Sequence, residues 1–341
     1  MTSTDVPTRR RSDVFAPLTR TRLWQREKQS LTVWPALLAV VIIGASLSPA
    51  FLTTSNLINV LQQGSSLAIL TLGMSLVLLT GRFDLSIEST LAFAPMIGAS
   101  MIVAAPMGFG LGLNPWVGML VTVLVGAAVG LFNGYLVTRF KLNSFITSLA
   151  MLILLRGATL GISGGQTIYS PPKEFTFLGS ARVGLIPVSI ILTAVLCVAV
   201  AVFLNHHRIG RSIYAIGSNE EAARAAGIKV DRIVLGTFIT AGVFAALAGI
   251  VTSGRIDSVV ANQGTNEVLS VMAALAIGGF SLNGGRGTIF GAITGVLFLS
   301  LVANILTLSN VASYWVDASR GAIIVIALLM TRYTTRDVPK D

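Results

Sequence analysis

The sequence has 341 residues, 53% of them hydrophobic and only 11% charged, with a mean hydropathy of +0.80. That leaves too little polar surface to cover soluble globular domains, so a soluble protein is excluded. The formal net charge of +10 does not indicate nucleic-acid binding, because seven of the 24 basic residues precede Trp34 and most of the others lie between apolar runs. A membrane surface explains that distribution better.

Apolar runs long enough to cross a bilayer recur along the chain. They predict an all-α integral membrane protein with about ten transmembrane segments, some of them broken or short. Helices are expected because barrel strands would need only about ten residues each. The segments cover residues 31–51, 57–80, 88–105, 115–138, 143–163, 184–204, 233–254, 267–281, 287–308 and 312–331. The third, fifth and eighth are short or interrupted by glycine.

Basic residues set the expected orientation. With both termini in the cytoplasm, 19 of the 24 lysines and arginines fall on the cytoplasmic side, as the positive-inside rule requires. Residues 1–30 are then a flexible basic cytoplasmic tail, and residues 332–341 form a second tail. Residues 31–331 form one transmembrane domain, which includes a cytoplasmic loop over residues 205–232. The expected location is the cell membrane, with lipid around the helices.

Sequence signatures of catalysis are missing from the chain. No lysine follows a glycine, so the ATP-binding pattern G-x-x-x-x-G-K-[ST] does not occur. The two histidines, His206 and His207, are adjacent and have no cysteine nearby, since Cys197 lies in an apolar run. We therefore expect no catalytic residues, no metal site and no cofactor bound by this chain.

Ionisable groups at membrane depth are informative exceptions. The stretch GRFDLSIES (81–89) brings Arg82, Asp84 and Glu88 to the end of the second segment. A charge at the bilayer centre costs about 2.5–3.5 kcal/mol on insertion scales, so such groups need water, protein or each other. The stretch is either a solvated turn whose charges pair or a structured break that lines a cavity. Arg156 is either a snorkelling anchor or a residue that faces a polar pathway.

Uncharged polar side chains also lie within the spans. Gln62, Gln63, Asn133, Asn304 and Thr307 can tie helices together, at about 1 kcal/mol or less each. The same groups suit a ligand made of hydroxyl groups, which needs hydrogen bonds and no charge. The candidate substrate path consists of Gln62, Asn133, Arg156, Gln166 and Asn304.

Two glycine stripes predict close helix packing. Each is a double G-x-x-x-G on one helix face, where the backbone of another helix can approach, and a moving helix contact is the alternative. The stripes are Gly126, Gly130 and Gly134, and Gly287, Gly291 and Gly295.

The stretch SNEEAARAAGIKV (218–230) predicts a short polar helix between apolar runs. Ser218 and Glu221 have the S-x-x-E spacing of a capping box, and Gly227 can provide a left-handed stop. Alanines at positions 222, 223, 225 and 226 favour a helix and leave a smooth surface. Two turns are marginal alone in water, where about 12–15 residues are usually needed. This helix therefore needs a surface on which to dock.

Four stretches carry a family resemblance. GRFDLSIES (81–89) is similar to a G-G-[IV]-D-L-S-V-G segment, and LNSFITSLAMLILLRGATLGISGGQTI (142–168) contains an R-G pair and a G-G-Q. AIGSNEEAARAAGI (215–228) matches A-x-G-x-N-x-x-A-A-x-x-x-G-I, and GGFSLNGGRGTIFGAITG (278–295) matches G-G-x-S-x-x-G-G-R-G. From about residue 35 to 330 the chain thus resembles the ribose-type sugar permeases of ABC importers. Arg82 and Glu88 stand where that family has glycines.

The resemblance implies a permease subunit that works as a pair, with an identical or a related second permease, and forms the path for a sugar or polyol. It implies two further partners, an ATP-binding cassette subunit that holds ATP and Mg²⁺ and an extracytoplasmic sugar-binding protein. Residues of the third motif would couple to the ATPase: Ser218, Asn219, Glu221, Ala222, Ala223 and Gly227. Residues of the first and fourth would form conformational loops: Asp84, Ser86, Gly285 and Arg286.

Other functions stay open on the residues alone. A branched-chain amino acid permease of the ABC type shares the architecture, but its zwitterionic ligand needs charge complements in the path. An ion-coupled secondary transporter needs a coupling-ion site, and the membrane-proximal acids Asp84, Glu88 and Asp317 do not lie in the middle of predicted helices. A membrane enzyme has no catalytic cluster to support it.

Overall fold

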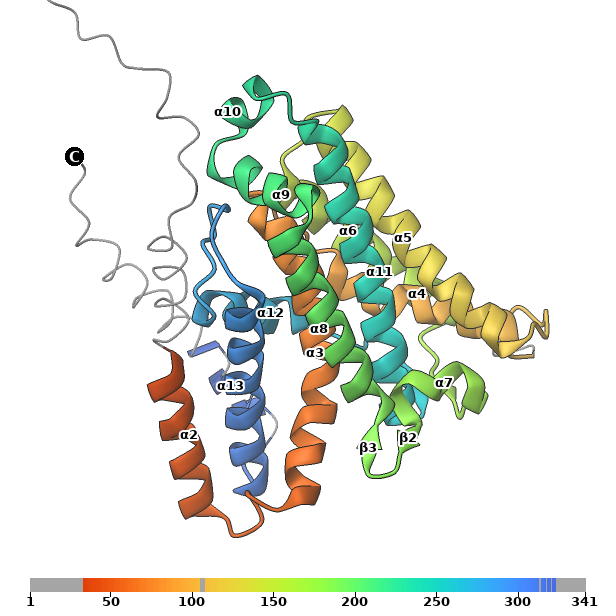
Figure 1. The fold of residues 1–341 in the computed structure, drawn as a ribbon. Helices are drawn as coiled ribbons and strands as arrows, with labels where there is room; N and C mark the ends of the chain where they lie inside the picture. The colour runs from red at the N-terminus through yellow and green to blue at the C-terminus, as the bar shows by residue number, and fades with distance from the viewer. Residues whose placement is uncertain (1–32, 105–107, 313, 317, 320, 323–341) are drawn as a thin grey trace, which may run out of the picture.

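The computed structural model describes residues 33–104, 108–312, 314–316, 318–319 and 321–322, most of them helical (Figure 1). The helices are α2 (Val33–Leu47), α3 (Thr54–Leu79), α4 (Ile87–Ile102), α5 (Pro115–Arg139), α6 (Ser144–Ser163), α7 (Lys173–Ser180), α8 (Val188–His206), α9 (Arg208–Ser218), α10 (Glu220–Ala225), α11 (Val230–Ile256), α12 (Glu267–Ile277) and α13 (Ile289–Leu308). Two antiparallel strand pairs join β1 (Ile168–Tyr169) to β4 (Ser258–Val259) and β2 (Arg182–Val183) to β3 (Ile186–Pro187).

The fold is that of an all-helical membrane protein, as predicted. Six of the described helices, α3, α5, α6, α8, α11 and α13, are long and apolar enough to cross a membrane. The third and eighth predicted segments, 88–105 and 267–281, are the shorter helices α4 and α12, whereas the fifth, 143–163, is full-length. Most of the tenth, 312–331, and both tails, 1–30 and 332–341, lie outside the described residues, so the count of ten stays a prediction.

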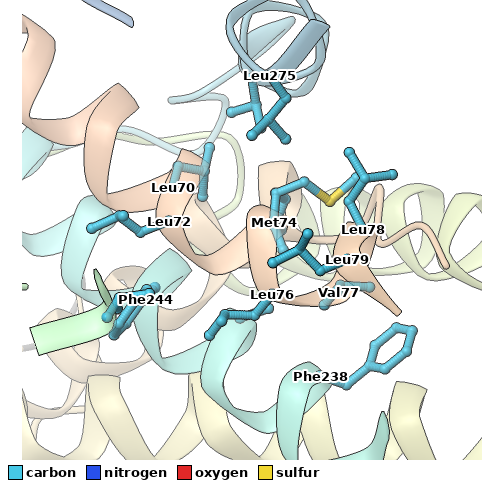
Figure 2. Close-up of a cluster of buried hydrophobic side chains, with 14 of the residues drawn as sticks. Leu70, Leu72, Met74, Leu76, Val77, Leu78, Leu79, Phe238, Phe244 and Leu275 are labelled. Carbon is cyan, nitrogen blue, oxygen red and sulfur yellow. The ribbon is translucent and has the colours of Figure 1, made fainter. Parts of the chain in front are cut away.

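The core lies where α3 packs against α11, α13, α8 and α12. In their most apolar stretches, 72% of α3 and 61% of α11 are buried, against 17% of α8. Figure 2 shows the central cluster, in which Leu72 and Leu76 of α3 lie on the side of Phe244 of α11, whereas Met74 lies on the side of Leu275 of α12. The outer helices turn apolar side chains outward, as helices do when lipid replaces water around them.

The first glycine stripe is a close seam between α5 and α11. A Cβ on Gly130 would collide with the carbonyl oxygen of Phe238, and one on Gly126 with the carbonyl oxygen of Gly242. Because both neighbours are backbone atoms, no side chain can move to make room. The predicted close packing is confirmed here.

The second stripe is shorter than predicted. Gly287 precedes α13, has a φ of +150° and packs against the ring of Phe280, so it is not on a helix face. Gly291 and Gly295 do lie in α13, where added Cβ atoms would meet the backbone of α12 and the residue after it. Gly287 turns the chain into α13 with a positive φ. It therefore cannot share the helical i, i+4 spacing of Gly291 and Gly295.

Two short helices begin inside the bundle. After α3 the chain turns at Gly81, with a φ of +76°, and leads back among the helices before α4 starts. Glu88 in the first turn of α4 accepts the backbone N–H of Val268, in the first turn of α12, at 3.3 Å. Both residues are 6% exposed. Helix N-termini thus meet inside the bundle, a geometry by which broken membrane helices place polar groups.

The bundle has two different ends (Figure 1). At one end α9 and α10 lie across the C-terminal end of α3 and the loop over residues 278–288. At the opposite end lie α7 and the β2–β3 hairpin. Polar chemistry must therefore be sought separately at each end and in the middle.

Candidate functional site

The loop over residues 205–232 folds as the two short helices α9 and α10. α9 is amphipathic, with Ile213 and Ile216 buried in the core and Arg211 exposed. α10 follows after the single residue Asn219, whose side-chain oxygen accepts the backbone N–H of Ala222 at 2.9 Å. That bond satisfies one of the free N–H groups at the start of α10.

The cap of α10 differs from the predicted capping box. Ser218 is the last residue of α9, and its hydroxyl donates to the Tyr214 carbonyl at 2.8 Å. Asn219 instead has the extended backbone that a cap requires, with φ −162° and ψ 105°. Glu221 is exposed in the first turn of α10, where its charge suits the helix dipole. The serine is unsuitable as a cap because its backbone still belongs to α9.

The end of α10 agrees with the sequence. Gly227 adopts the predicted left-handed conformation, with a φ of +80°, and the N–H of Ile228 donates to the carbonyl of Ala223 at 3.1 Å. This pattern satisfies carbonyl groups that a helix end would leave free.

The alanines of α10 do not form one free surface. Ala223 is 4% exposed and belongs to the main hydrophobic core, whereas Ala222, Ala225 and Ala226 are exposed. Ala223 therefore anchors α10 to its own bundle. The exposed alanines are the ones available to a partner, so the predicted smooth surface does not include Ala223.

Charged side chains fix the position of α10. Glu220 accepts from Arg82 on one carboxylate oxygen and from Arg224 on the other, at 2.9 Å each, and Arg224 also contacts Asp231 at 2.6 Å. Partial burial acts to raise the pKa of Glu220, but the hydrogen bonds and positive charges of Arg224 and Arg82 outweigh it and lower the pKa below its ordinary 4.5. Arg82, a departure from the family pattern, thus ties the break after α3 to α10.

Glycines allow three backbones to meet beneath α9. A Cβ on Gly217 would collide with the carbonyl oxygen of Leu79 and with the N–H of Gly285. The Gly285 N–H itself donates to the Leu79 carbonyl at 3.0 Å. Gly285 is buried with a φ of +70°, and its neighbour Arg286 is exposed at the same end of the bundle.

The stretch 81–89 is a structured break. The carboxylate of Asp84, 1% exposed, accepts the backbone N–H of Ser86 at 3.1 Å and its hydroxyl at 2.6 Å. Asn133 of α5 donates to the Ser86 hydroxyl oxygen at 2.5 Å and to Asp84 at 3.4 Å. Asp84, Ser86 and Asn133 therefore form one buried polar cluster that joins the break to α5.

Arg156 is neither a lipid-facing anchor nor free. Its guanidinium donates to Glu88 at 2.9 Å and also contacts the Thr265 hydroxyl, and the two paired side chains are 19% and 8% exposed. Since Glu88 also accepts from Val268, this carboxylate links α4, α6 and α12. The charges that depart from the family pattern are thus both used in long-range ion pairs.

The other predicted path residues lie apart from one another. Gln62 donates to the Gly179 carbonyl at 3.2 Å, which joins α3 to α7. Asn304 and Asn56 exchange two hydrogen bonds of 2.9 Å between α13 and α3. Gln166 is exposed in the turn after α6. Their described contacts hold the bundle together, and their part in a path stays a prediction.

A polar cavity of about 90 Å³ opens between α3, α4, α11, α12 and α13. None of the five predicted path residues lines it, although the neighbouring Gln63 does. The i, i+3 spacing of Gln63 and Ser66 would have revealed part of this face in the sequence. Its polar lining consists of Gln63, Ser66, Thr252, Arg255, Glu267, Ser270 and Ser300. Among the described residues, acids, histidines and cysteines form no cluster that could hold a metal ion.

Membrane-length helices, short helices that begin at depth and a polar cavity between them are the architecture of a membrane transport component. The chain belongs to the family described as "Branched-chain amino acid transport system / permease component", whose model matches residues 56–328. This is a family of transport permeases, not of enzymes.

Three relatives show the branch of the family. The ribose import permease protein of Escherichia coli strain K12 is 36% identical over 314 residues, which cover 91% of this chain and 95% of the relative. The ribose import permease protein of Bacillus subtilis strain 168 is 36% identical over 306 residues, covering 89% and 93%. The D-allose transport system permease protein of Escherichia coli strain K12 is 32% identical over 299 residues, covering 87% and 90%. The resemblance to ribose-type sugar permeases is confirmed.

Proposed function

We propose that this chain is the transmembrane subunit of an importer that carries a sugar or polyol and draws its energy from a separate ATP-binding cassette subunit. The observation that carries the proposal is 36% identity to a ribose import permease over 91% of this chain. The lack of a P-loop in the sequence agrees, since ATP and Mg²⁺ would then be bound by the partner.

The ATPase would dock on α9 and α10. α10 has six residues, too few for a stable helix alone, and it is held by Ala223 and by the ion pairs of Glu220 and Arg224. Its exposed face carries Ala222, Ala225 and Ala226. Small side chains on a fixed helix let a partner groove approach closely, as coupling requires.

The α9–α10 end would face the cytoplasm and the α7 end the outside, in the cell membrane. The basic residues support this orientation. Of the lysines and arginines that the structure describes, Lys173, Arg182 and Arg255 lie near the α7 end, whereas Lys141, Arg208, Arg211 and Arg224 are among those at the α9–α10 end. Cysteine substitutions at the exposed serines Ser180 and Ser218 can test this orientation. On a Cys197→Ala background, Ser180→Cys should react with an impermeant thiol reagent in intact cells, and Ser218→Cys only after permeabilisation. Labelling of Ser218→Cys in intact cells would contradict the orientation.

Two further partners complete the proposal. A second permease, identical or related, would cover part of the apolar surface that α5, α6 and α8 expose, and lipid would cover the rest. A sugar-binding protein would deliver the ligand at the α7 end.

The energy source that drives uptake distinguishes this proposal from its alternatives. We expect uptake by the reconstituted complex to need the ATPase subunit and ATP, and to survive collapse of proton and sodium gradients. Uptake that persists without the ATPase and stops with a protonophore would identify a secondary transporter. The family description favours one further candidate, a branched-chain amino acid, and ATP-driven uptake of L-leucine in place of sugars would identify it.

A further inference from the structure

The polar cavity lies between five helices of the bundle, α3, α4, α11, α12 and α13. Ser66 stands near the middle of α3 and Ser300 near the middle of α13, while Glu267 is the first residue of α12. The cavity therefore sits beside a helix that begins at depth. Helix starts of this kind face binding sites in broken-helix transporters.

The lining joins opposite charges to hydroxyl groups. Arg255 in the last turn of α11 and Glu267 in the first turn of α12 each lie at the helix end that suits their charge. Together they leave the site without net charge. Guanidinium N–H groups and carboxylate oxygens form strong hydrogen bonds with hydroxyls, which both donate and accept.

The remaining walls fit the same kind of ligand. Leu67, Leu91 and Leu299 supply apolar surface for C–H groups, and Ser270, which is 3% exposed, presents a hydroxyl. The Ser66 hydroxyl donates to the carbonyl of Ala248 at 3.1 Å or forms a hydrogen bond of 2.6 Å with the Thr252 hydroxyl, in which either oxygen can donate. Its oxygen keeps accepting capacity. A few placed polar groups on an apolar frame are the usual design of a small-molecule site.

Volume points in the same direction. A buried water needs on the order of 10–15 Å³ of such space, so a cavity of about 90 Å³ has room for several hydroxyl-sized groups in a row. Ligand hydroxyls that replace water in such a space would keep the number of hydrogen bonds nearly constant. A site on a transport path has to bind its ligand weakly enough to release it, and such an exchange would meet that requirement.

We infer that this cavity is a subsite of the translocation path that holds one neutral monosaccharide, with Arg255, Glu267 and Ser300 as hydrogen-bonding residues. The inference rests on the proposed sugar import. A branched-chain amino acid could also face a charge pair, but its apolar side chain would leave the surrounding hydroxyls without partners.

The test uses the full complex, with ATPase and binding protein, and radiolabelled D-ribose, D-allose and L-leucine as probes. Ser300→Ala removes one cavity hydroxyl from α13. Thr294→Val is its matched control, because the Thr294 hydroxyl is buried in the same helix, bonds to the Phe290 carbonyl at 2.8 Å and does not line the cavity. We expect sugar uptake at limiting sugar to fall about fivefold for Ser300→Ala, as one lost neutral hydrogen bond implies, and by at least about tenfold for Glu267→Gln. Thr294→Val should stay within about twofold of the unmodified chain.

A second readout does not depend on transport. On a Cys197→Ala background, Ser300→Cys should react with a small methanethiosulfonate reagent, and excess sugar that the complex imports should slow the reaction while sucrose does not. Equal uptake in Ser300→Ala, Glu267→Gln and Thr294→Val, or no protection by the imported sugar, would overturn the assignment of the cavity while leaving sugar import intact. An unmodified complex that imports L-leucine and neither sugar would overturn the proposed function and the subsite with it.

Discussion

Arg82 and Glu220 are 138 positions apart in the chain, yet a guanidinium nitrogen of the first donates to a carboxylate oxygen of the second at 2.9 Å. The bond joins the break after α3 to the first turn of α10. Their side chains are 19% and 37% exposed, so water screens part of the attraction.

A double-mutant cycle should show this pair as a weak but real coupling. Arg82→Ala and Glu220→Gln should each lower the melting temperature in nanodiscs, with an interaction energy of about 0.5–1 kcal/mol. Glu221→Gln is the control, since Glu221 is the exposed neighbour in the same turn. A coupling to Arg82 as large for Glu221 as for Glu220 would contradict a specific bond.

The same carboxylate predicts a pH dependence. Because the folded protein holds the pKa of Glu220 below its ordinary 4.5, the charged form stabilises the fold fully above pH 4.5, and this contribution is lost as pH falls through the folded pKa. The difference in melting temperature between the unmodified chain and Glu220→Gln should therefore shrink from pH 7 to acid pH. A difference that stays constant would contradict the assignment.

Arg156 should matter more for stability than a lipid-facing anchor would. Arg156→Ala leaves the buried carboxylate of Glu88 without its cation, at a cost on the order of 3 kcal/mol. Glu88→Gln added to Arg156→Ala should recover a large part of that loss, because the buried charge is gone. Thermal unfolding of these two variants and of the unmodified chain measures the loss. An Arg156→Ala variant as stable as the unmodified chain would return Arg156 to an anchoring role.

Two glycines near the seam between α5 and α11 make a matched pair. Gly130→Ala puts a methyl group against the backbone at Phe238, so the helices must separate and we expect a loss of about 2–3 kcal/mol or a failure to assemble. Gly236→Ala, in α11 with no atom within 4 Å of the added Cβ, should be neutral or stabilise by about 0.5–1 kcal/mol. Melting temperatures in the opposite order would contradict the seam.

The proposed docking face of α10 can be tested separately from Ala223, which anchors the helix. Ala222→Arg adds bulk and charge to an exposed position, so it should weaken co-purification of the ATPase at least tenfold while the melting temperature stays unchanged. Ala222→Ser is the control of similar size. Ala223→Arg should instead unfold the protein locally, because that side chain is buried. Full ATPase binding by Ala222→Arg would remove α10 from the interface.

Periodicity and spacing were sufficient to predict the six described helices of membrane length, the seam at Gly126, Gly130 and Gly134, and the left-handed Gly227. These features depend on local sequence or on a rule that any partner helix satisfies. The cap at Asn219 was missed because Ser218 and Asn219 are both good caps, and only the end of α9 decides between them.

Contacts between residues that lie far apart in the sequence explain the features of the structure that the sequence did not predict. Arg156 and Glu88 lie 68 positions apart, and no local pattern shows that they meet. The cavity draws its lining from five helices, so its residues share no spacing beyond Gln63 and Ser66. Polar residues such as Gln62 and Asn304 stand out in an apolar sequence whether they bind a ligand or hold helices together. The sequence alone does not distinguish these two roles, and the described contacts are between helices.

Backbone contact at Gly217 has a mechanical consequence. Side chains have several rotatable bonds and absorb small displacements, whereas the Gly217, Leu79 and Gly285 backbones meet with no side chain between them. The contact between these three backbone segments therefore deforms little. α3 extends from it for 26 residues, about 39 Å at 1.5 Å per residue, past the wall that Ser66 forms in the cavity. If the ATPase docks on α9 as proposed, a tilt of α9 would move α3 as a stiff unit, with little of the displacement lost in side-chain rearrangement.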